Sequence, residues 1–285
     1  MEAAGQKTLG LIAGTGDIAM AVARDAKAQG YRLVTVALKN LASPELEEVS
    51  DLTGWYNVGK VGGIIKFLRE NGATEAVAAG KVPKSVLYAG GGVWPDFRAM
   101  GILLKLRSRQ DDSIIATIEK EFAKDGIAFL DMKDFCRDML TPEGVLTRKK
   151  PSRTEDKDIE FGFRMAKGIG DLDIGQTVVV KRQAVMAVEA IEGTDEAIRR
   201  GGALAGKGAV VVKVARPGQD MRFDVPVIGL NTLESMREVN ARVLAAEAGM
   251  SILMDREQFL KKPKEYGITV VGTSGSDLRA LTQKK

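Results

Sequence analysis

The chain has 285 residues, which is long for one hydrophobic core and sufficient for two domains. Its 42 basic and 38 acidic residues leave a formal charge of +4 at pH 7, a small excess spread evenly along the sequence. This balance argues against a nucleic-acid-binding protein, because such proteins concentrate positive charge where they meet phosphates. No apolar run approaches the roughly 20 residues that a membrane-spanning helix needs.

The scarce residue types narrow the chemistry. The sequence contains no histidine, which excludes imidazole zinc sites, Ser-His-Asp triads and histidine general bases. The single cysteine, Cys136, has no internal disulfide partner and is expected to be a buried thiol in a reducing compartment. The first residues lack the basic flank and apolar region of a secretory signal, so we expect a cytoplasmic protein. Any catalysis must then use carboxylates, cations, hydroxyls or a bound ion.

The first half of the sequence alternates strand and helix patterns. Thr8 to Ala13 is an apolar run of strand length, and an alanine-rich helical segment follows it. A second strand over 31–38, a helix over 61–70 and a short buried strand over 75–79 continue the alternation. This order predicts a parallel sheet covered on both faces, and hence a Rossmann-like domain over residues 1–145.

The loop after the first strand reads Gly14-Thr15-Gly16-Asp17-Ile18-Ala19. Glycines at this spacing, between a strand and a helix, let the backbone approach an anion at the helix N-terminus. An NAD site would usually carry Asp or Glu at the end of the second strand, which here ends Ala37-Leu38-Lys39-Asn40. We therefore favour contact of Gly14, Thr15 and Gly16 with a nucleotide or sugar phosphate over NAD binding, with a simple tight turn as the alternative.

Two further segments of the first half could meet a ligand. Gly80 and Lys81 follow a buried strand and should lie at the carboxyl edge of the sheet, where open α/β folds bind ligands, or else form an ordinary loop. Between Trp94 and Arg109, apolar and basic residues alternate at helical spacing. Such a helix either packs on the core with a charged outer face or meets acyl chains or an anionic membrane surface.

The polar segment from Thr141 to Lys157 carries two prolines and has no sustained period, and we place a linker at 146–157 within it. The remaining residues, 158–285, form the predicted C-terminal catalytic α/β domain. Its clearest predicted elements are a helix over 158–168 and strands over 176–181, 184–190 and 209–215.

Negative charge is concentrated after the second of these strands, at Glu189, Glu192 and Asp195. Carboxylates this close together require a cation or protons, which a metal ion or a nearby lysine or arginine would supply. The alternative is structural: Thr194 caps a helix, Asp195 complements the helix dipole and Glu189 is exposed.

The stretch from Lys213 onward sets two carboxylates among three cations. Asp220 and Asp224 could hold a hard metal ion, while Lys213, Arg216 and Arg222 could neutralise phosphate oxygens. This mixture suits phosphoryl chemistry, because the charge of the phosphates must be neutralised before water can approach.

Several motifs of the second half and the opening segment Leu9-Gly10-Leu11-Ile12-Ala13-Gly14 form one set that is informative when taken together. They are Asp173-Ile174-Gly175-Gln176, Glu192-Gly193-Thr194-Asp195, Arg216-Pro217-x-Gln219-Asp220-x-Arg222-x-Asp224-x-Pro226-x-Ile228-Gly229 and Ala246-Glu247-Ala248-Gly249. With this set the chain resembles the histidine-free UDP-2,3-diacylglucosamine pyrophosphatases of lipid A biosynthesis. The likeness covers nearly the whole chain and is densest from about residue 170 to 255.

The resemblance implies a two-domain, magnesium-dependent hydrolase that cleaves UDP-2,3-diacylglucosamine to UMP and 2,3-diacylglucosamine 1-phosphate. It implies that Asp224 is the acidic residue on which catalysis depends, that water attacks the sugar-side phosphorus and that the ligand lies between the domains. It also implies peripheral contact with the cytoplasmic face of the inner membrane and a homodimer.

Together these inferences assign roles to individual residues. We expect Asp224 to bind magnesium or orient the attacking water, with Asp220 and Asp195 completing the oxygen shell of the ion and Lys213 and Arg222 on the phosphates. The other predicted substrate contacts are Gly14, Thr15, Gly16, Gly80, Lys81, Gln176, Glu189, Glu192, Gly193, Thr194, Arg216 and Gln219. A nucleotide-dependent oxidoreductase and a noncatalytic nucleotide-sugar-binding protein remain as alternatives, although neither needs the grouped carboxylates and cations.

Overall fold

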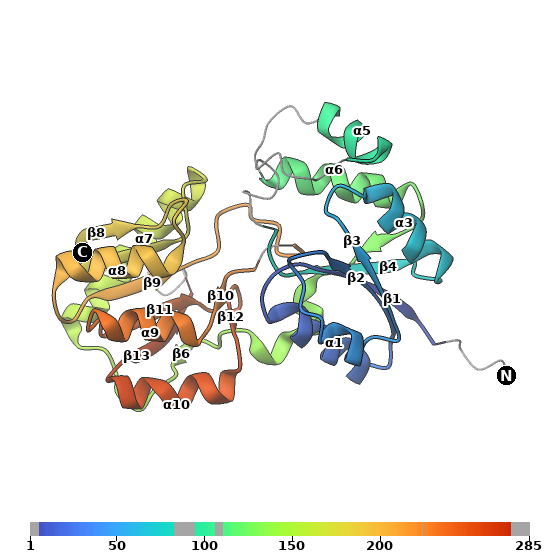
Figure 1. Ribbon diagram of the computed structural model, residues 1–285. Coiled ribbons are helices and arrows are strands. Elements are labelled where there is room, and N and C mark those ends of the chain that lie inside the picture. Colours follow the sequence, from blue (N-terminus) through green and yellow to red (C-terminus); the bar gives the residue numbers. More distant parts are fainter. Residues whose placement is uncertain (1–5, 83–94, 106–110, 224, 275–285) are drawn as a thin grey trace. The chain divides into compact units, whose positions relative to one another are not determined.

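The computed structural model describes residues 6–82, 95–105, 111–223 and 225–274. The chain forms two compact units, each built around its own sheet (Figure 1). The first unit comprises residues 1–137 and the short segment 220–224, and the second comprises 138–219 and 225–285. The predicted α/β class, with a parallel sheet in the first half, is confirmed.

The sheet of the first unit has, within the described residues, the strand order β3-β2-β1-β4-β5, and every pair is parallel. β1 lies at its centre, where Leu9, Leu11 and Ala13 are completely buried. A parallel strand covered on both faces needs no polar alternation, which explains its continuous apolar sequence. The strands are β1 (Thr8–Ala13), β2 (Arg32–Leu38), β3 (Leu52–Tyr56), β4 (Glu75–Ala79) and β5 (Ala128–Phe129).

Helices cover both faces of this sheet (Figure 1). α3 packs against Val34 and Val36 with Ile64, Ile65 and Leu68, whose spacing places them on one face of the helix. α1 packs on the opposite face. The helices of this unit are α1 (Ile18–Ala28), α2 (Leu46–Val49), α3 (Val61–Glu70), α5 (Phe97–Lys105) and α6 (Asp111–Ala123), and the 3-10 turns η1 (Met132–Phe135) and η2 (Arg137–Met139) follow.

Cys136 is buried at the end of this unit, as predicted, and its Sγ donates to Met132 O at 3.2 Å. Burial raises the pKa of the Cys136 thiol to about 12, so the thiol stays protonated at neutral pH.

The sheet of the second unit has the order β6-β13-β11-β9-β7-β8 in the part of the chain described. β9, β11 and β13 are parallel, whereas β7 runs antiparallel to β8 and β9, and β6 runs antiparallel to β13. A further pair, β10 and β12, is parallel. The strands are β6 (Gly144–Val145), β7 (Thr177–Lys181), β8 (Ala184–Val188), β9 (Val210–Lys213), β10 (Val227–Ile228), β11 (Val243–Glu247), β12 (Ile252–Leu253) and β13 (Thr269–Thr273).

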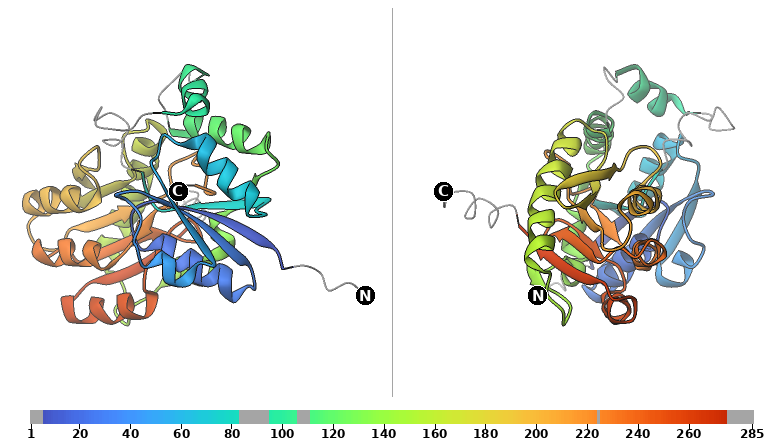
Figure 2. Two further views of the ribbon diagram at one scale, coloured as in Figure 1. Left: turned by 45° about the vertical axis from the view of Figure 1, so that its right-hand side comes forward. Right: turned by 90° about the vertical axis from the view of Figure 1, so that its left-hand side faces the viewer.

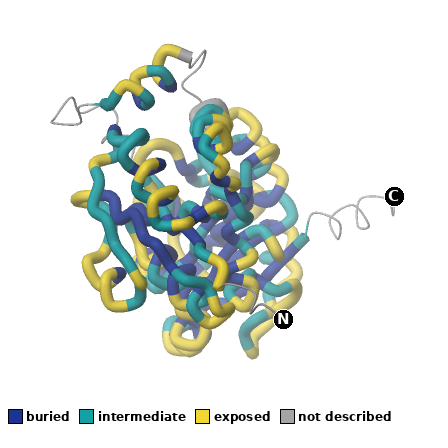
Figure 3. The backbone as a smooth tube through the Cα atoms, turned by 90° about the vertical axis from the view of Figure 1, so that its right-hand side faces the viewer, coloured by how far each residue is buried: buried dark blue, intermediate teal, exposed yellow. Residues whose placement is uncertain are grey.

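Alternate residues of these strands face different helices. Val178 and Val212 pack with α7 on one face, while Val179 and Val211 pack with α8 and α9 on the other. The resulting central strands are buried and the outer faces of the helices exposed, as the tube in Figure 3 shows. The helices are α7 (Arg153–Asp171), α8 (Thr194–Ala205), α9 (Leu230–Glu238) and α10 (Arg256–Tyr266).

The segment placed as a linker, 146–157, belongs to the second unit. It follows β6 and ends in the first turn of α7, which begins with a capping box between Ser152 and Glu155.

The views in Figure 2 follow the strands and helices of each unit from two further directions. No helix among the described residues is long and apolar enough to span a bilayer.

Candidate functional site

In the first unit, the loops that follow β1 and β4 lie side by side at the carboxyl edge of the sheet. The strand order reverses between β1 and β4, where open α/β sheets form a ligand crevice. Thr15 N donates to Lys81 O at 2.9 Å, and Lys81 N donates back to Thr15 O at 3.1 Å. The structure therefore brings the predicted loops Gly14–Gly16 and Gly80–Lys81 together.

Glycine is required where these two backbones meet. A Cβ on Gly14 would lie 2.6 Å from Lys81 O, and a Cβ on Gly80 would lie 2.6 Å from Thr15 O. Gly80 also has a φ of 91°, which favours glycine. The amides of Gly14 and Thr15 donate to carbonyl oxygens of the protein itself, so the exposed member of the predicted phosphate loop is Gly16.

In the second unit, a buried polar group lies at the carboxyl edge of the sheet. The Nζ of Lys213, at the end of β9, donates to Thr194 Oγ1 and to Val227 O, both at 3.0 Å. Thr194 Oγ1 in turn donates to Glu189 Oε1 at 2.8 Å. Lys213 is 3% and Glu189 8% exposed, so the alternative of an exposed Glu189 is wrong. We call Lys213, Thr194 and Glu189 the relay group.

Local backbone geometry brings the relay group together. Thr194 opens α8 directly after Gly193, whose φ of 87° turns the chain into the helix. Glu189 N donates to Thr177 O at 2.8 Å, which holds the end of β8 beside the start of β7. Any side chain on Gly175 would overlap the carbonyl oxygen of Glu189, so the motif Asp-Ile-Gly-Gln needs its glycine there.

Three oxygens at this edge are buried and have no hydrogen-bond partner within the described residues: Glu189 Oε2, Gln176 Oε1 and Thr177 Oγ1. Proteins pair nearly all such atoms, because leaving one unpaired costs about 1–3 kcal/mol. A ligand that donates hydrogen bonds would be stabilised here. The structure thus brings predicted Gln176, Glu189, Thr194 and Lys213 to one edge of one sheet.

Glu192 and Asp195 lie at the start of α8 in different surroundings. The Glu192 carboxylate accepts from its own backbone N–H and pairs with Arg200, and these contacts hold its pKa below the usual value. Arg200 thereby supplies the cation that Glu192 requires. Asp195 is the second residue of α8, where a carboxylate complements the helix dipole.

Arg216 and Gln219 form a turn after β9. Arg216 N donates to Gln219 Oε1 at 2.7 Å, and the Arg216 guanidinium pairs with Asp173. The motifs that contain Asp173 and Arg216, far apart in sequence, are therefore joined by an ion pair in the second unit.

Two charged residues at this edge, Glu247 and Lys167, were assigned no role from the sequence, although Glu247 belongs to the motif Ala246-Glu247-Ala248-Gly249. Glu247 Oε2 accepts from Ala215 N at 2.8 Å and from Lys167 Nζ at 2.7 Å, and Lys167 Nζ also donates to Ala215 O at 2.8 Å. They position the backbone that leads from β9 to Arg216. The signal was present: Glu247 is a carboxylate at the end of an otherwise apolar strand.

Asp220 and Arg222 belong to the first unit, whereas Asp195 and Lys213 belong to the second. Arg222 pairs with Asp220 and with Glu119 of α6. The hydrogen bonds from Arg222 lower the pKa of Asp220, and the two carboxylates raise the pKa of Arg222. Both predicted roles, metal ligand and phosphate partner, thus fall on charges that are already paired.

The remaining predicted metal ligand, Asp224, lies outside the described residues. Magnesium needs several oxygen ligands. Among the residues that are described, no group of three or more Asp, Glu, Cys or His side chains could hold a metal ion. These residues alone do not form the predicted magnesium site.

Comparison with known proteins decides the family. A model of the LpxI N-terminal domain matches residues 8–139, and a model of the LpxI C-terminal domain matches residues 142–271. The chain belongs to the LpxI family. The resemblance seen in the sequence is thereby confirmed.

A curated LpxI relative from Caulobacter vibrioides, named UDP-2,3-diacylglucosamine pyrophosphatase, is 31% identical over 93% of this chain and 97% of its own length. Among solved structures, gox2253 aligns over 97% of this chain and 88% of its own, with 10% identity and a TM-score of 0.30. Rhizobium etli pyruvate carboxylase aligns over 47% of this chain and 12% of its own, with 14% identity and a TM-score of 0.29. Both scores are too low to bear on fold or activity.

Proposed function

We propose that this LpxI-family chain hydrolyses the pyrophosphate bond of UDP-2,3-diacylglucosamine, giving UMP and 2,3-diacylglucosamine 1-phosphate in lipid A biosynthesis. The predicted class, a hydrolase of a phosphoric anhydride, agrees with the name of the curated relative. The structural observation that carries the proposal is the relay group, in which a buried ammonium, a hydroxyl and a carboxylate with one unpaired oxygen meet at a sheet edge.

The relay group supplies two functions that this reaction needs. When water attacks one phosphorus, the bond to the bridging oxygen breaks and negative charge grows on the leaving phosphate. The buried Lys213 ammonium would stabilise that charge strongly, because little water screens it. Glu189 Oε2 would accept a hydrogen bond from a substrate hydroxyl and so orient the substrate.

Asp224 stays the acidic residue on which, by the resemblance, catalysis depends, and its role is to bind magnesium or to orient the attacking water. Magnesium dependence likewise stays a prediction, because the described residues alone do not assemble its site. The homodimer also stays a prediction, and the mass of the protein in solution checks it.

The decisive experiment incubates purified protein with diacylated UDP-glucosamine, with magnesium or with EDTA, and measures UMP by chromatography. Reaction in ¹⁸O-labelled water shows which phosphorus is attacked: label in the sugar phosphate means attack on the sugar side. The Asp224→Asn variant should bind substrate but lose most turnover, whereas Asp171→Asn, an exposed carboxylate at the end of α7, should not. Absence of UMP under both metal conditions would refute the proposal.

We also propose peripheral contact with a membrane surface through α5. Its residues Phe97 and Leu104 are 95% and 83% exposed, and Met100 and Leu103 share the exposed face, whereas Ile102 is buried. The helix therefore faces the core only in part, and its apolar outer face suits the boundary of a bilayer, from which a diacylated substrate would come.

Co-sedimentation with phospholipid vesicles tests this contact. The double variant Phe97→Ser with Leu104→Ser should bind vesicles several-fold more weakly than Leu172→Ser with Leu204→Ser, which removes two exposed leucines of the second unit. Equal vesicle binding by the two variants would contradict the contact. If only the KM for detergent-dispersed substrate changed, α5 would contact the acyl chains instead.

A further inference from the structure

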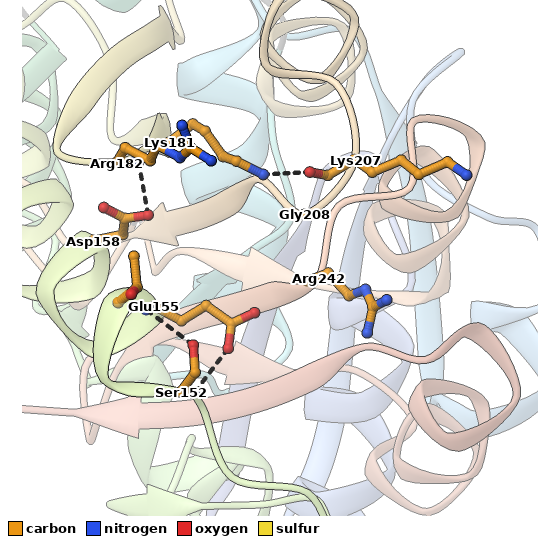
Figure 4. Close-up of a pocket in the computed structure, with 9 residues that line it drawn as sticks. Ser152, Glu155, Asp158, Lys181, Arg182, Lys207, Gly208 and Arg242 are labelled. Carbon is orange, nitrogen blue, oxygen red and sulfur yellow. Dashed lines mark hydrogen bonds between the residues drawn. The ribbon is translucent and has the colours of Figure 1, made fainter.

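A pocket lies in the second unit, and Figure 4 shows the residues that line it. It is at the opposite ends of the strands from the relay group. Strand register fixes its place: β7 pairs Thr177 with Lys213 and Val180 with Val210, so Lys181 lies beside the start of β9. The two ends are about 13 Å apart, the length of a strand of this size. The pocket has a volume of about 340 Å³ and is lined by Ser152, Thr154, Glu155, Asp158, Lys181, Arg182, Lys207, Gly208 and Arg242.

Four cations and two carboxylates line this pocket, which gives it an excess of positive charge. Both carboxylates bond to backbone amides: Asp158 accepts from Arg182 N at 2.9 Å and from Gln183 N at 2.6 Å, and Glu155 accepts from Ser152 N at 2.8 Å. These bonds hold the walls of the pocket together, and the two carboxylates offset only part of the charge of the four cations.

The four cations of the pocket differ from its carboxylates in their hydrogen bonds. Lys181 Nζ donates to the carbonyl oxygen of Lys207. In the described ranges, the side chains of Arg182, Lys207 and Arg242 form no hydrogen bond or ion pair. All three residues are exposed, as is Arg200 of the same unit, which differs from them in being paired with Glu192. The pocket therefore retains positive charge that an anion would neutralise.

The backbone that carries these cations is held firmly. Arg182 and Gln183 form the two-residue loop between β7 and β8, with the positive φ values, 50° and 59°, of the type I′ turn that suits a hairpin, and the buried Asp158 accepts from both of their amides. Arg242 is tied on both sides, since its N donates to Ala209 O and its O accepts from Thr269 N, each at 2.8 Å. These bonds fix the backbone positions from which Arg182 and Arg242 extend.

We propose that this pocket binds the phosphate dianion of a small soluble phosphomonoester. The planar guanidinium groups of Arg182 and Arg242 suit bidentate contact with phosphate, whereas Lys207 faces the pocket with its carbonyl oxygen and extends its ammonium away from Lys181 (Figure 4). The volume lies at the lower end of the range for small-molecule sites, which leaves room for a small organic group beside the phosphate. This site is separate from the proposed hydrolytic centre and does not depend on it.

Inorganic phosphate is the probe. Amide chemical shifts of the full-length protein are followed by NMR during a phosphate titration, against sodium chloride at equal ionic strength. We expect saturable shifts at Arg182, Gly208 and Arg242 with phosphate alone. Binding should weaken about tenfold in Arg242→Ala and in Arg182→Ala, the loss of one charge-assisted contact. It should be unchanged in Arg164→Ala, which removes an exposed arginine from α7 outside the pocket.

Two control measurements accompany the titration. Circular dichroism confirms that each variant is folded, and UMP release by Arg242→Ala should match that of the unaltered protein. The proposal is overturned if the pocket amides do not saturate, if only amides near Lys213 respond, or if Arg242→Ala and Arg182→Ala both bind phosphate as tightly as Arg164→Ala. Failure of the hydrolysis assay would leave this result unaffected.

Discussion

The carboxyl edges of the two sheets differ in what they expose to a ligand. In the first unit, the loops after β1 and β4 bond to each other through their backbones, and Gly14 and Gly80 make that approach possible. In the second unit, the corresponding edge carries buried ionisable side chains, Lys213 and Glu189, and oxygens that have no hydrogen-bond partner in the described part of the chain.

The contrast shows that a ligand-binding position in an α/β sheet does not by itself make a catalytic one. The amides of Gly14 and Thr15 already donate to carbonyl oxygens, which leaves Gly16 as the exposed member of the predicted phosphate loop, and its contact with a phosphate stays a prediction. A buried ammonium beside an incompletely paired carboxylate lowers the stability of the fold. Such destabilising groups are common at functional sites. The chemistry is therefore expected at the second edge.

The largest expected effect on activity comes from a substitution of Lys213. Lys213→Met keeps the length of the side chain but removes the charge, and we expect kcat to fall about 10²–10³-fold, as when one transition-state donor is lost. UMP release at saturating substrate measures it. Lys261→Met, at an exposed position on α10, is the control and should stay within about twofold. A similar kcat for both variants would mean that the second edge is not the catalytic one.

Gly80→Ala tests whether the first edge depends on close packing. A Cβ at this position meets Thr15 O and a positive φ, so the free energy of unfolding should fall by about 2 kcal/mol or more. Gly101→Ala, in α5 with open space around its Cβ, should instead be neutral or stabilising by up to about 1 kcal/mol. Urea denaturation of both variants decides, and equal stabilities would show that the two loops are not held together as described.

Glu189→Gln sharpens the role of the relay group. The amide oxygen can still accept from Thr194, but the charge on the unpaired side is lost, so kcat/KM should fall about tenfold with little change in stability. Steady-state kinetics measure this change. Glu196→Gln, an exposed carboxylate of α8, should leave kcat/KM within about twofold, and a drop of the same size there would assign the effect to surface charge.

The smallest effect concerns the segment 220–223 in the first unit. The bonds from Arg222 lower the pKa of Asp220, so this carboxylate stabilises the fold above its unfolded pKa and loses that contribution as the pH falls. The stability difference between the unaltered protein and Asp220→Asn should therefore be present near neutral pH, and it should decrease once the pH falls below the ordinary pKa of an aspartate and passes through the lowered pKa of Asp220. Urea denaturation across pH, with Asp171→Asn as control, measures it. A difference independent of pH would contradict the pairing.

Much of the fold followed from local pattern. The limits of β1, β4 and α3 are those predicted, because continuous apolar runs and one-sided helical spacing leave few alternatives. β3 was not predicted, since Leu-Thr-Gly-Trp-Tyr is short, half-buried and interrupted by glycine. α7 begins at Arg153, earlier than the predicted helix, because its polar first turn is stabilised by the capping box at Ser152.

The candidate site was predictable only in part. Residue types indicated phosphoryl chemistry and singled out Lys213 and Glu189, because charged groups after buried strands are unusual, whereas Thr194 was predicted as a substrate contact or a helix cap. Sequence could not show that Arg222 is shared between Asp220 and Glu119, since Glu119 lies more than a hundred residues away along the chain. Glu247 was assigned no role for the same reason, as its partner Lys167 lies on another element.

By itself the sequence determined the family, the α/β class and the kind of chemistry, because these follow from residue types and from spacing along the chain. Tertiary structure alone decided which charges are paired, which loops are closed by their own backbone, and that the segment 220–223 packs in the first unit. The physical reason is that pairing and burial depend on distances in space, and residues that meet at a sheet edge come from segments with no fixed separation in sequence.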